Sequence, residues 1–223
     1  MAEKRYRNRT TSICEIEAKD EYRFCYGVYN LVNLRKEKFE PGKSYHILSD
    51  GKVDMLNHLR WLIMLYGRIE HVCISSWSIS ATNILLLERW HDDGELGSVD
   101  LVVGDIFPAK FREEWSALLR LRERGGVLKT LYTGKIHAKL ILAEAASGER
   151  IVVESSANAN MNPRCEQSVV SVSPELHEFY RSYFEAKFDE YVRKECSKEI
   201  LKNEERNEKA DHSAGLTLFG EEW

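Results

Sequence analysis

Residues 136–170 hold a set of side chains whose types and spacing suit chemistry at phosphorus. His137 and Lys139 stand two residues apart in an apolar stretch, so in an extended strand their side chains point to the same face. Both cost free energy to bury unless they have a partner or face a cleft. Asn158 and Glu166 follow a second apolar stretch. The set predicts a site where an imidazole, an ammonium group, an amide and a carboxylate meet.

These four groups match the needs of phosphoryl transfer without a metal ion. An imidazole attacks phosphorus or protonates a leaving oxygen near neutral pH. An ammonium group and an amide stabilise the charged oxygens of the transition state, and a carboxylate fixes the tautomer of the histidine. A histidine and a lysine at this spacing also occur by chance, and a lone histidine on an apolar strand is more often a core residue. The hypothesis of a phosphoryl-transfer site therefore depends on the order in which all four residues follow one another along the chain, not on the histidine and lysine alone.

The elements that position these groups follow from apolar periodicity. Apolar runs bounded by turn residues are predicted strands, at 45–48, 72–77, 99–103, 127–132, 136–143, 151–154 and 169–172. Stretches with helical spacing are predicted helices, at 52–67, at 80–92, between Pro108 and Gly125, and from Ser173 onward. Strands that alternate with helices predict an α/β fold with a mixed, largely parallel sheet flanked by helices.

Composition divides the 223-residue chain into three parts. Residues 1–20 are polar with several basic side chains and are predicted to form a flexible basic arm. Residues 21–192 hold the predicted catalytic α/β domain. Residues 193–223 begin with a charged stretch, predicted as a helix extension, and end in an apolar peptide tail.

Composition also excludes several classes of protein. The apolar fraction of 43% excludes disorder of the whole chain. No apolar run approaches the ~20 residues of a membrane-spanning helix, and the N-terminus lacks the apolar stretch of a secretory signal, so a cytoplasmic protein away from membranes is expected. Five widely spaced cysteines without a C-x-x-C pair argue against a disulfide framework and a zinc site, and neither metal nor cofactor is expected.

The net charge of −4 requires that any contact with nucleic acid rests on a local patch. Residues 129–164 supply one, because they hold five basic side chains (Lys129, Lys135, Lys139, Arg150 and Arg164) against three acidic ones (Glu144, Glu149 and Glu154). The sequence therefore predicts modest, salt-sensitive binding in a local cleft rather than tight non-specific binding.

The order of these residues resembles the phospholipase D superfamily, whose motif is H-x-K-x4-D followed downstream by G-S-x-N. The chain has His137-Ala138-Lys139, with Glu144 at the position of the aspartate. It has Ser155-Ser156-Ala157-Asn158 in place of G-S-x-N. The predicted elements over about residues 45–192 also look like those of the small bacterial nuclease branch of that superfamily.

The resemblance implies a role for each matched residue. His137 is the expected nucleophile, which forms a phosphohistidine intermediate. Lys139 and Asn158 are expected to bind phosphate oxygens, with Ser156 as a further donor. Glu166 is expected to hydrogen-bond to His137 and orient it. The superfamily uses two such motifs and this chain holds one, so the resemblance implies a homodimer with two copies of His137 across a shared cleft.

Further contacts are expected around this cleft. Ser155, Lys135 and Arg164 are candidate substrate-binding residues from the motif and its neighbouring loops. Trp77 and Ser78, at the end of an inner strand, are further candidates for the same cleft, although core packing is the better explanation for Trp77. The tail residues Leu216, Leu218 and Phe219 resemble the short peptide by which bacterial DNA-processing proteins bind the replication sliding clamp, with Gly215 in place of the usual glutamine.

Two functions of different classes follow. The first is a metal-independent phosphodiesterase, a nuclease acting on DNA from a homodimeric active site. The second is a dimeric nucleic-acid-binding module of the same fold with weak or no turnover. A lipid phosphodiesterase is a third, disfavoured by the lack of a predicted membrane anchor. Hydrolysis in the presence of a chelator separates the first from the second.

Overall fold

The computed structural model describes residues 14–16, 20–25, 35–50, 53–161 and 164–188. Its strands are β1 (Cys14–Ile16), β2 (Asp20–Cys25), β3 (Ser44–Asp50), β4 (Ile69–Ser76), β5 (Leu96–Gly104), β6 (Leu128–Gly134), β7 (Leu140–Ala145), β8 (Arg150–Ser155) and β9 (Cys165–Val172). Its helices are α2 (Met55–Tyr66), α3 (Ala81–Asp92), α4 (Phe107–Lys110) and α5 (Arg112–Glu123), and a further helix covers 174–188. None of these helices is both long and apolar enough to cross a membrane.

Parts of the predicted organisation fall outside these residues. Most of the predicted arm does, although the backbone of Cys14–Ile16, within it, pairs with β2. The tail with Leu216, Leu218 and Phe219 also lies outside the described residues, so the clamp-binding peptide stays a prediction. Contacts divide the chain into residues 1–181 and residues 182–223, and the sheet with helices α2 to α5 belongs to the first unit.

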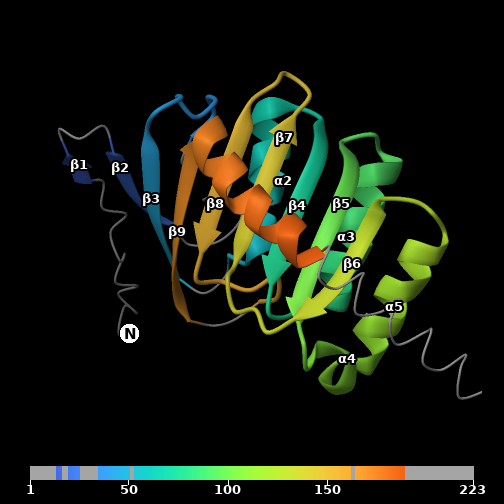
Figure 1. The fold of residues 1–223 in the computed structure, drawn as a ribbon. Helices are drawn as coiled ribbons and strands as arrows, with labels where there is room; N and C mark the ends of the chain where they lie inside the picture. Colours follow the sequence, from blue (N-terminus) through green and yellow to red (C-terminus); the bar gives the residue numbers. More distant parts are fainter. Residues whose placement is uncertain (1–13, 17–19, 26–34, 51–52, 162–163, 189–223) are drawn as a thin grey trace, which may run out of the picture. The chain divides into compact units, whose positions relative to one another are not determined.

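The strands form one sheet in the order β1-β2-β3-β9-β8-β7-β4-β5-β6 (Figure 1). The prediction of an α/β fold with a mixed sheet flanked by helices is confirmed. The prediction that the sheet is largely parallel is wrong, because five of the described neighbouring pairs are antiparallel and three are parallel. Strands β4, β5 and β6, joined by helices, are parallel, whereas β7 to β9 are joined without helices and alternate in direction.

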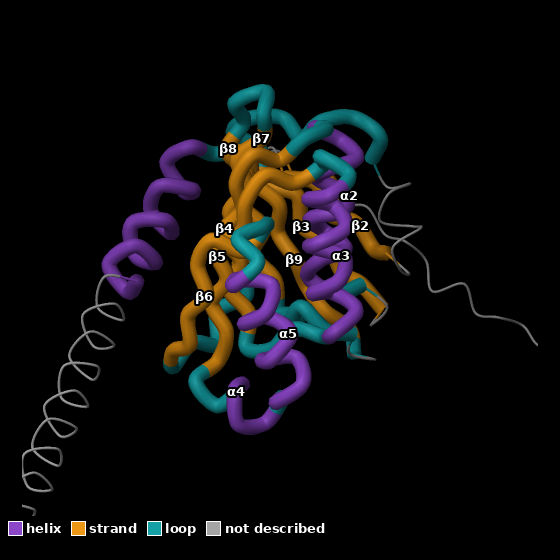
Figure 2. Tube along the Cα trace, turned by 90° about the vertical axis from the view of Figure 1, so that its right-hand side faces the viewer, coloured by secondary structure: helices purple, strands orange, loops and turns teal. Residues whose placement is uncertain are grey.

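Helices cover both faces of the sheet. Helices α2, α3 and α5 lie on one face, and the helix that begins at residue 174 starts on the other (Figures 1 and 2). Two contacts join this last helix to the sheet. The hydroxyl of Tyr180 donates to Glu154 of β8 at 2.5 Å, and Arg181 forms an ion pair with Glu144 of β7. The apolar core between the sheet and α2 and α3 includes Leu59, Leu62 and other fully buried side chains.

The two helices nearest the predicted site begin at strong N-caps. At the start of α2, Asp54 accepts a hydrogen bond from the backbone N–H of Asn57, whose side chain accepts one from the backbone N–H of Asp54. At the start of α3, Ser80 accepts one from the backbone N–H of Asn83. Such caps bind N–H groups that have no partner within the helix, so they fix where each helix begins.

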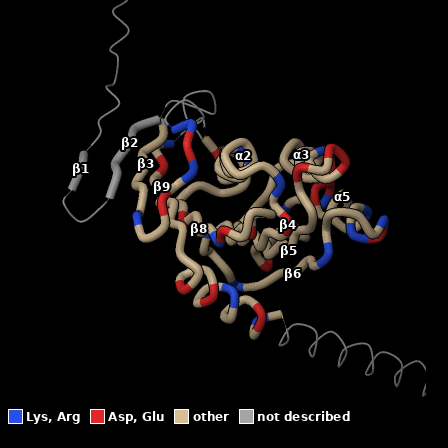
Figure 3. The backbone as a smooth tube through the Cα atoms, turned by 90° about the horizontal axis from the view of Figure 1, so that it is seen from above, with Lys and Arg blue, Asp and Glu red and all other residues tan. Residues whose placement is uncertain are grey.

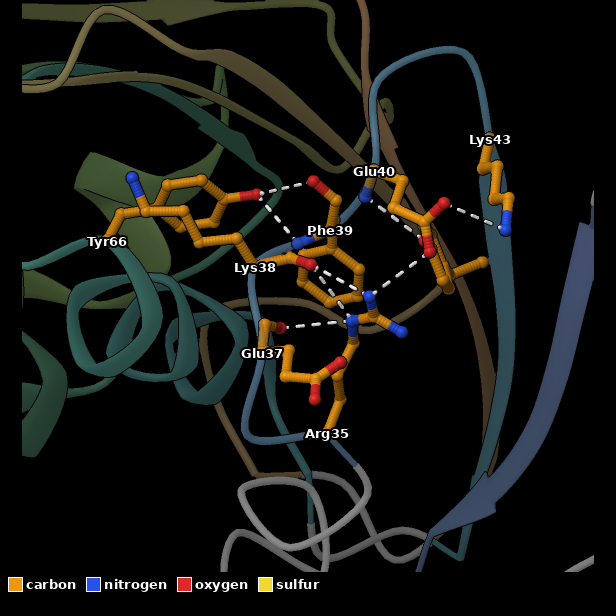
Figure 4. Close-up of polar contacts among 8 residues, drawn as sticks. Arg35, Glu37, Lys38, Phe39, Glu40, Lys43 and Tyr66 are labelled. Atoms are coloured by element: carbon orange, nitrogen blue, oxygen red, sulfur yellow. Dashed lines mark hydrogen bonds and ion pairs between the residues drawn. The ribbon is translucent and has the colours of Figure 1, made fainter.

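The segment before β3 is anchored on α2. Phe39 is buried, and its backbone N–H donates to the hydroxyl of Tyr66 at 2.9 Å (Figure 4). The indole N–H of Trp61 donates to the carbonyl of Arg35 at 3.1 Å. The guanidinium of Arg35 donates to the carbonyls of residues 37 and 38 and lies 3.5 Å from the Glu40 carboxylate. These contacts fix how the chain enters the central part of the sheet.

Candidate active site

The predicted site residues gather at one edge of the sheet. Strands β4 and β8 both run antiparallel to β7, which lies between them, so the two run parallel to each other. The ladders end at the pairs Ser75↔Leu140 and Leu140↔Glu154. The carboxyl ends of β4 and β8 therefore meet the start of β7, at the lower edge of the sheet in Figure 1.

His137 and Lys139 precede β7 rather than lying within it. The prediction of a strand from residue 136 is wrong, because β7 begins at Leu140, where its ladder with β4 ends. The segment extends past the sheet instead, and the hydroxyl of Ser75 donates to the carbonyl of Ala138 at 2.8 Å. Lys139 is attached to β8 through its carbonyl, which accepts from the backbone N–H of Ser155 at 3.0 Å. Two neighbouring strands thus hold the H-x-K segment in place.

The lysine of this pair is buried and lies against the histidine. Lys139 is 8% exposed, whereas His137 is exposed. The Lys139 ammonium nitrogen lies 2.9 Å from Nδ1 of His137 and donates to the His137 carbonyl at 2.7 Å. Burial lowers the pKa of Lys139, and the negative charge of Glu166 opposes that shift. A buried cation beside an exposed imidazole is suited to hold an anion that the imidazole attacks.

Ser156 and Glu166 form the next part of the cluster. The hydroxyl of Ser156 donates to Oε2 of Glu166 and accepts from the backbone N–H of Gln167 at 3.0 Å. Glu166 is 8% exposed, and its charge acts on Lys139. The structure thus brings Glu166 to Ser156 and Lys139. Its expected role as the group that orients His137 stays a prediction.

Asn158 is oriented by the backbone of Trp77, the residue that follows β4. Its Oδ1 accepts a hydrogen bond from the backbone N–H of Trp77 at 3.2 Å. Because the oxygen of the amide is engaged there, its nitrogen is the atom available to donate to a phosphate oxygen. The adjacent N–H, of Ala159, donates to the hydroxyl of Ser76 at 2.9 Å, and that hydroxyl donates to the carbonyl of Ser78 at 2.7 Å.

Three other candidates have different surroundings. The hydroxyl of Ser155 contacts that of Ser168 on β9 at 2.9 Å and accepts from the N–H of Ala157 at 3.0 Å, which stabilises the turn before Asn158. Lys135 and Arg164 are exposed and have no ion-pair partner among the described residues. Their roles in substrate binding stay predictions.

Several charged residues of the stretch 129–164 contact partners elsewhere in the chain. Basic and acidic residues are interspersed over the described residues (Figure 3). The three acidic residues of the stretch 129–164 each contact a partner outside it: Glu144 contacts Arg181, Glu149 contacts Lys38 and Glu154 contacts Tyr180. Arg150 of the same stretch lies 3.7 Å from Glu178, and the charge of Glu166 acts on Lys139, so the positive patch expected from the sequence stays a prediction.

Ser75 and Ser76 are the site residues that sequence reasoning missed. Both are fully buried at the end of β4, and they contact the two halves of the motif. Two adjacent serines at the end of an otherwise apolar strand were the signal available in the sequence. Among the described side chains, no group of three or more His, Cys, Asp or Glu residues is arranged to hold a metal ion.

The H-x-K segment and the S-x-N loop thus meet at one sheet edge. The chain resembles the phospholipase D superfamily. No protein-family model matches it, and no curated protein sequence does. Its structure is similar to that of Nuc from Salmonella typhimurium, a phospholipase D family member, with a TM-score of 0.47 and 17% identity, over 66% of this chain and 95% of that one.

Two larger proteins share the similarity over part of their length. Polyphosphate kinase from Porphyromonas gingivalis matches with a TM-score of 0.47 and 17% identity, over 69% of this chain and 26% of that one. Phosphatidylserine synthase from Haemophilus influenzae matches with a TM-score of 0.42 and 12% identity, over 67% of this chain and 38% of that one. Most of the length of these two proteins therefore lies outside the match.

Proposed function

We propose that the chain is a metal-independent phosphodiesterase that acts on DNA through a phosphohistidine at His137. The observation that carries the proposal is the buried Lys139 ammonium group, 2.9 Å from Nδ1 of the exposed His137. A substrate phosphate at this position would place a second anion beside Lys139, in addition to the Glu166 carboxylate, and next to the proposed nucleophile. Asn158, with its amide oxygen bonded to Trp77, adds a donor at the same edge.

The proposed reaction has two displacements at phosphorus. An imidazole nitrogen of His137 attacks, and the phosphorus–nitrogen bond forms as the bond to the leaving oxygen breaks. That oxygen takes a proton from His137 of a second copy of the chain. Water then attacks the phosphohistidine and gives a proton to the second histidine, while the phosphorus–nitrogen bond breaks and the phosphate product leaves. Lys139 and Asn158 bind the phosphate oxygens throughout.

A homodimer is part of this proposal because the chain holds one H-x-K motif. A two-fold axis through the cleft would place one His137 on each side of the scissile phosphate. One copy then attacks while the other acts as general acid and general base, which a single imidazole cannot do at the same time.

The test is hydrolysis of a DNA oligonucleotide and of bis(4-nitrophenyl) phosphate in excess EDTA. We expect wild-type turnover in both assays and none with His137→Ala. The matched control is His91→Ala, because His91 lies in the last turn of α3 and contacts Leu96, at the far end of β5 from the site. Hydrolysis that requires added magnesium, or that persists in His137→Ala, contradicts the proposal. Salt-dependent DNA binding without turnover would favour the binding module instead.

A further inference from the structure

The loop that carries Asn158 lies on a buried polar pair, Asp54 and Asn83. The side-chain nitrogen of Asn83 donates to Oδ2 of Asp54 and to the carbonyl of Ala159, both at 2.8 Å. Asp54 is 7% exposed and Asn83 is 3% exposed. An amide nitrogen carries two protons, so both donors of Asn83 are used, one toward the carboxylate and one toward the loop.

Asp54 and Asn83 lie at the N-termini of α2 and α3, and the backbone of both N-termini also binds the loop of Asn158. The N–H of Met55, the first residue of α2, donates to the carbonyl of Asn158 at 3.1 Å. The N–H of Ser80, the N-cap of α3, donates to the carbonyl of Ala159 at 3.0 Å. Two consecutive loop carbonyls are therefore held by two different helices. The Asp54–Asn83 hydrogen bond joins the starts of those helices.

We propose that Asp54 and Asn83 are positioning residues for Asn158, which fix its loop so that the amide nitrogen meets a substrate phosphate oxygen. This inference rests on the proposed function. A buried carboxylate is unfavourable unless its oxygens accept hydrogen bonds. Burial raises the pKa of Asp54, and the hydrogen bonds from Asn83 and Asn57 oppose that shift. Asn83 thus links the carbonyl of Ala159, next to Asn158, to the carboxylate of Asp54, which also accepts a hydrogen bond from the backbone N–H of Asn57.

The effect of Asn83 on activity should depend on the presence of Asn158, which a double-mutant cycle measures. We expect Asn83→Ala to lower kcat/KM about tenfold, the effect of one displaced hydrogen bond in the transition state. In the Asn158→Ala background the same substitution should lower kcat/KM by less than about twofold, because no amide remains to be positioned. The loss of thermal stability should be similar in both backgrounds. Equal losses of activity in the two backgrounds would overturn the proposal.

A second variant and a control separate positioning from folding. Asp54→Asn keeps a capping oxygen for α2 but turns an amide nitrogen, rather than an acceptor, toward Asn83. It should fold and should show the same dependence on Asn158. Ser98→Ala is the control, since Ser98 is a buried polar residue on β5 that contacts His71 and Glu70, away from the loop. It should lower stability without lowering kcat/KM, and a decrease in kcat/KM equal to that of Asn83→Ala would overturn the proposal.

The cycle remains informative if the wild-type chain hydrolyses nothing, in which case the proposed function fails separately. Binding of inorganic tungstate, a phosphate-like anion, is then followed by isothermal titration calorimetry. A weaker affinity in Asn83→Ala that disappears in the Asn158→Ala background supports positioning without catalysis. Identical affinities in all four proteins of the cycle, or no tungstate binding at all, overturn it.

Discussion

The backbone N–H of Trp77 donates to Oδ1 of Asn158 across 3.2 Å, and this bond joins the two halves of the site. Trp77 follows β4, whose Ser75 holds the H-x-K segment through the carbonyl of Ala138. Asn158 follows β8 in the S-x-N loop. The end of β4 therefore holds both the segment of His137 and the amide of Asn158, the proposed nucleophile and the proposed phosphate-binding group, although neither of these two residues lies on β4.

Gly104→Ala should disturb this bond from the neighbouring strand. A Cβ atom at Gly104 would lie 2.7 Å from Cδ1 of Trp77 and 3.0 Å from its carbonyl oxygen, so the side chain and backbone of Trp77 must move. We expect a loss of about 2 kcal/mol in the free energy of unfolding, as for other overpacked sites. We also expect a decrease of about tenfold in kcat/KM, from a displaced Asn158 amide.

The matched control is Gly134→Ala, because Gly134 is the partner of Gly104 in the β5–β6 ladder and a Cβ atom there would meet open space. It should leave stability and kcat/KM close to wild type. Chemical denaturation and steady-state kinetics measure both quantities. Equal effects of the two substitutions would show that the contact with Trp77 does not govern the site.

The pH dependence of anion binding should report the buried lysine. Burial lowers the pKa of Lys139, so its positive charge is lost at a lower pH than that of an exposed lysine. The affinity for tungstate should therefore fall as the pH rises through this lowered value, whereas the rate also depends on the proton of the second His137, the proposed general acid. Glu166→Gln removes the charge that opposes the shift, so the loss of affinity should move to still lower pH. Tungstate titrations of the two proteins across the pH range test this, and an unchanged or higher midpoint in Glu166→Gln would contradict it.

Acid should destabilise the fold through His58 on α2. Burial lowers the pKa of His58 to about 4, and its Nε2 has no hydrogen-bond partner among the described residues. The unfolded chain binds the proton near pH 6.5 and the folded chain only near pH 4, so stability falls as the pH is lowered through this window. The loss should reach about 3 kcal/mol. His58→Leu should flatten the dependence of unfolding free energy on pH, and an unchanged slope would contradict this.

Mixing active and inactive chains should reveal a shared active site. If each site needs His137 from both copies, a wild-type chain paired with His137→Ala is inactive. After subunit exchange with a ninefold excess of His137→Ala, activity per wild-type chain should fall to about one-tenth, the fraction still paired with wild type. The same excess of His91→Ala should leave it unchanged. Activity per wild-type chain that does not respond to the excess would show that each chain works alone.

Much of the fold is predictable because its signals are local. The spacing of Met55, Leu56, Leu59 and Ile63 predicts a helix, and the structure has α2 there. Apolar runs likewise predict the buried strands. Strand pairing is not local, however, since β7 inserts next to β4 rather than β6, and β9 pairs with β3 from the other end of the chain. The alternation of strands and helices predicted mainly parallel pairs. The pairs of β7 with β4 and of β9 with β3 are antiparallel instead.

The candidate site likewise has residues that the sequence identifies and residues that it does not. The motif identifies His137, Lys139, Ser156 and Asn158 because their spacing is visible in the sequence. It does not identify Asn83, whose bond to the Ala159 carbonyl spans 76 positions. Residues that support a site through such distant contacts carry no periodic pattern, so only the three-dimensional structure reveals them.

The covalent intermediate tests the central proposal most directly. Wild-type protein is mixed with a DNA oligonucleotide in excess EDTA, quenched with denaturant at alkaline pH to preserve phosphohistidine, and digested for mass spectrometry. We predict a phosphoryl adduct on the peptide that contains His137, lost on acid treatment and absent from His137→Ala. Turnover of the oligonucleotide under these conditions with the adduct on another residue, or with rapid quenching showing no adduct at any time, would contradict the account.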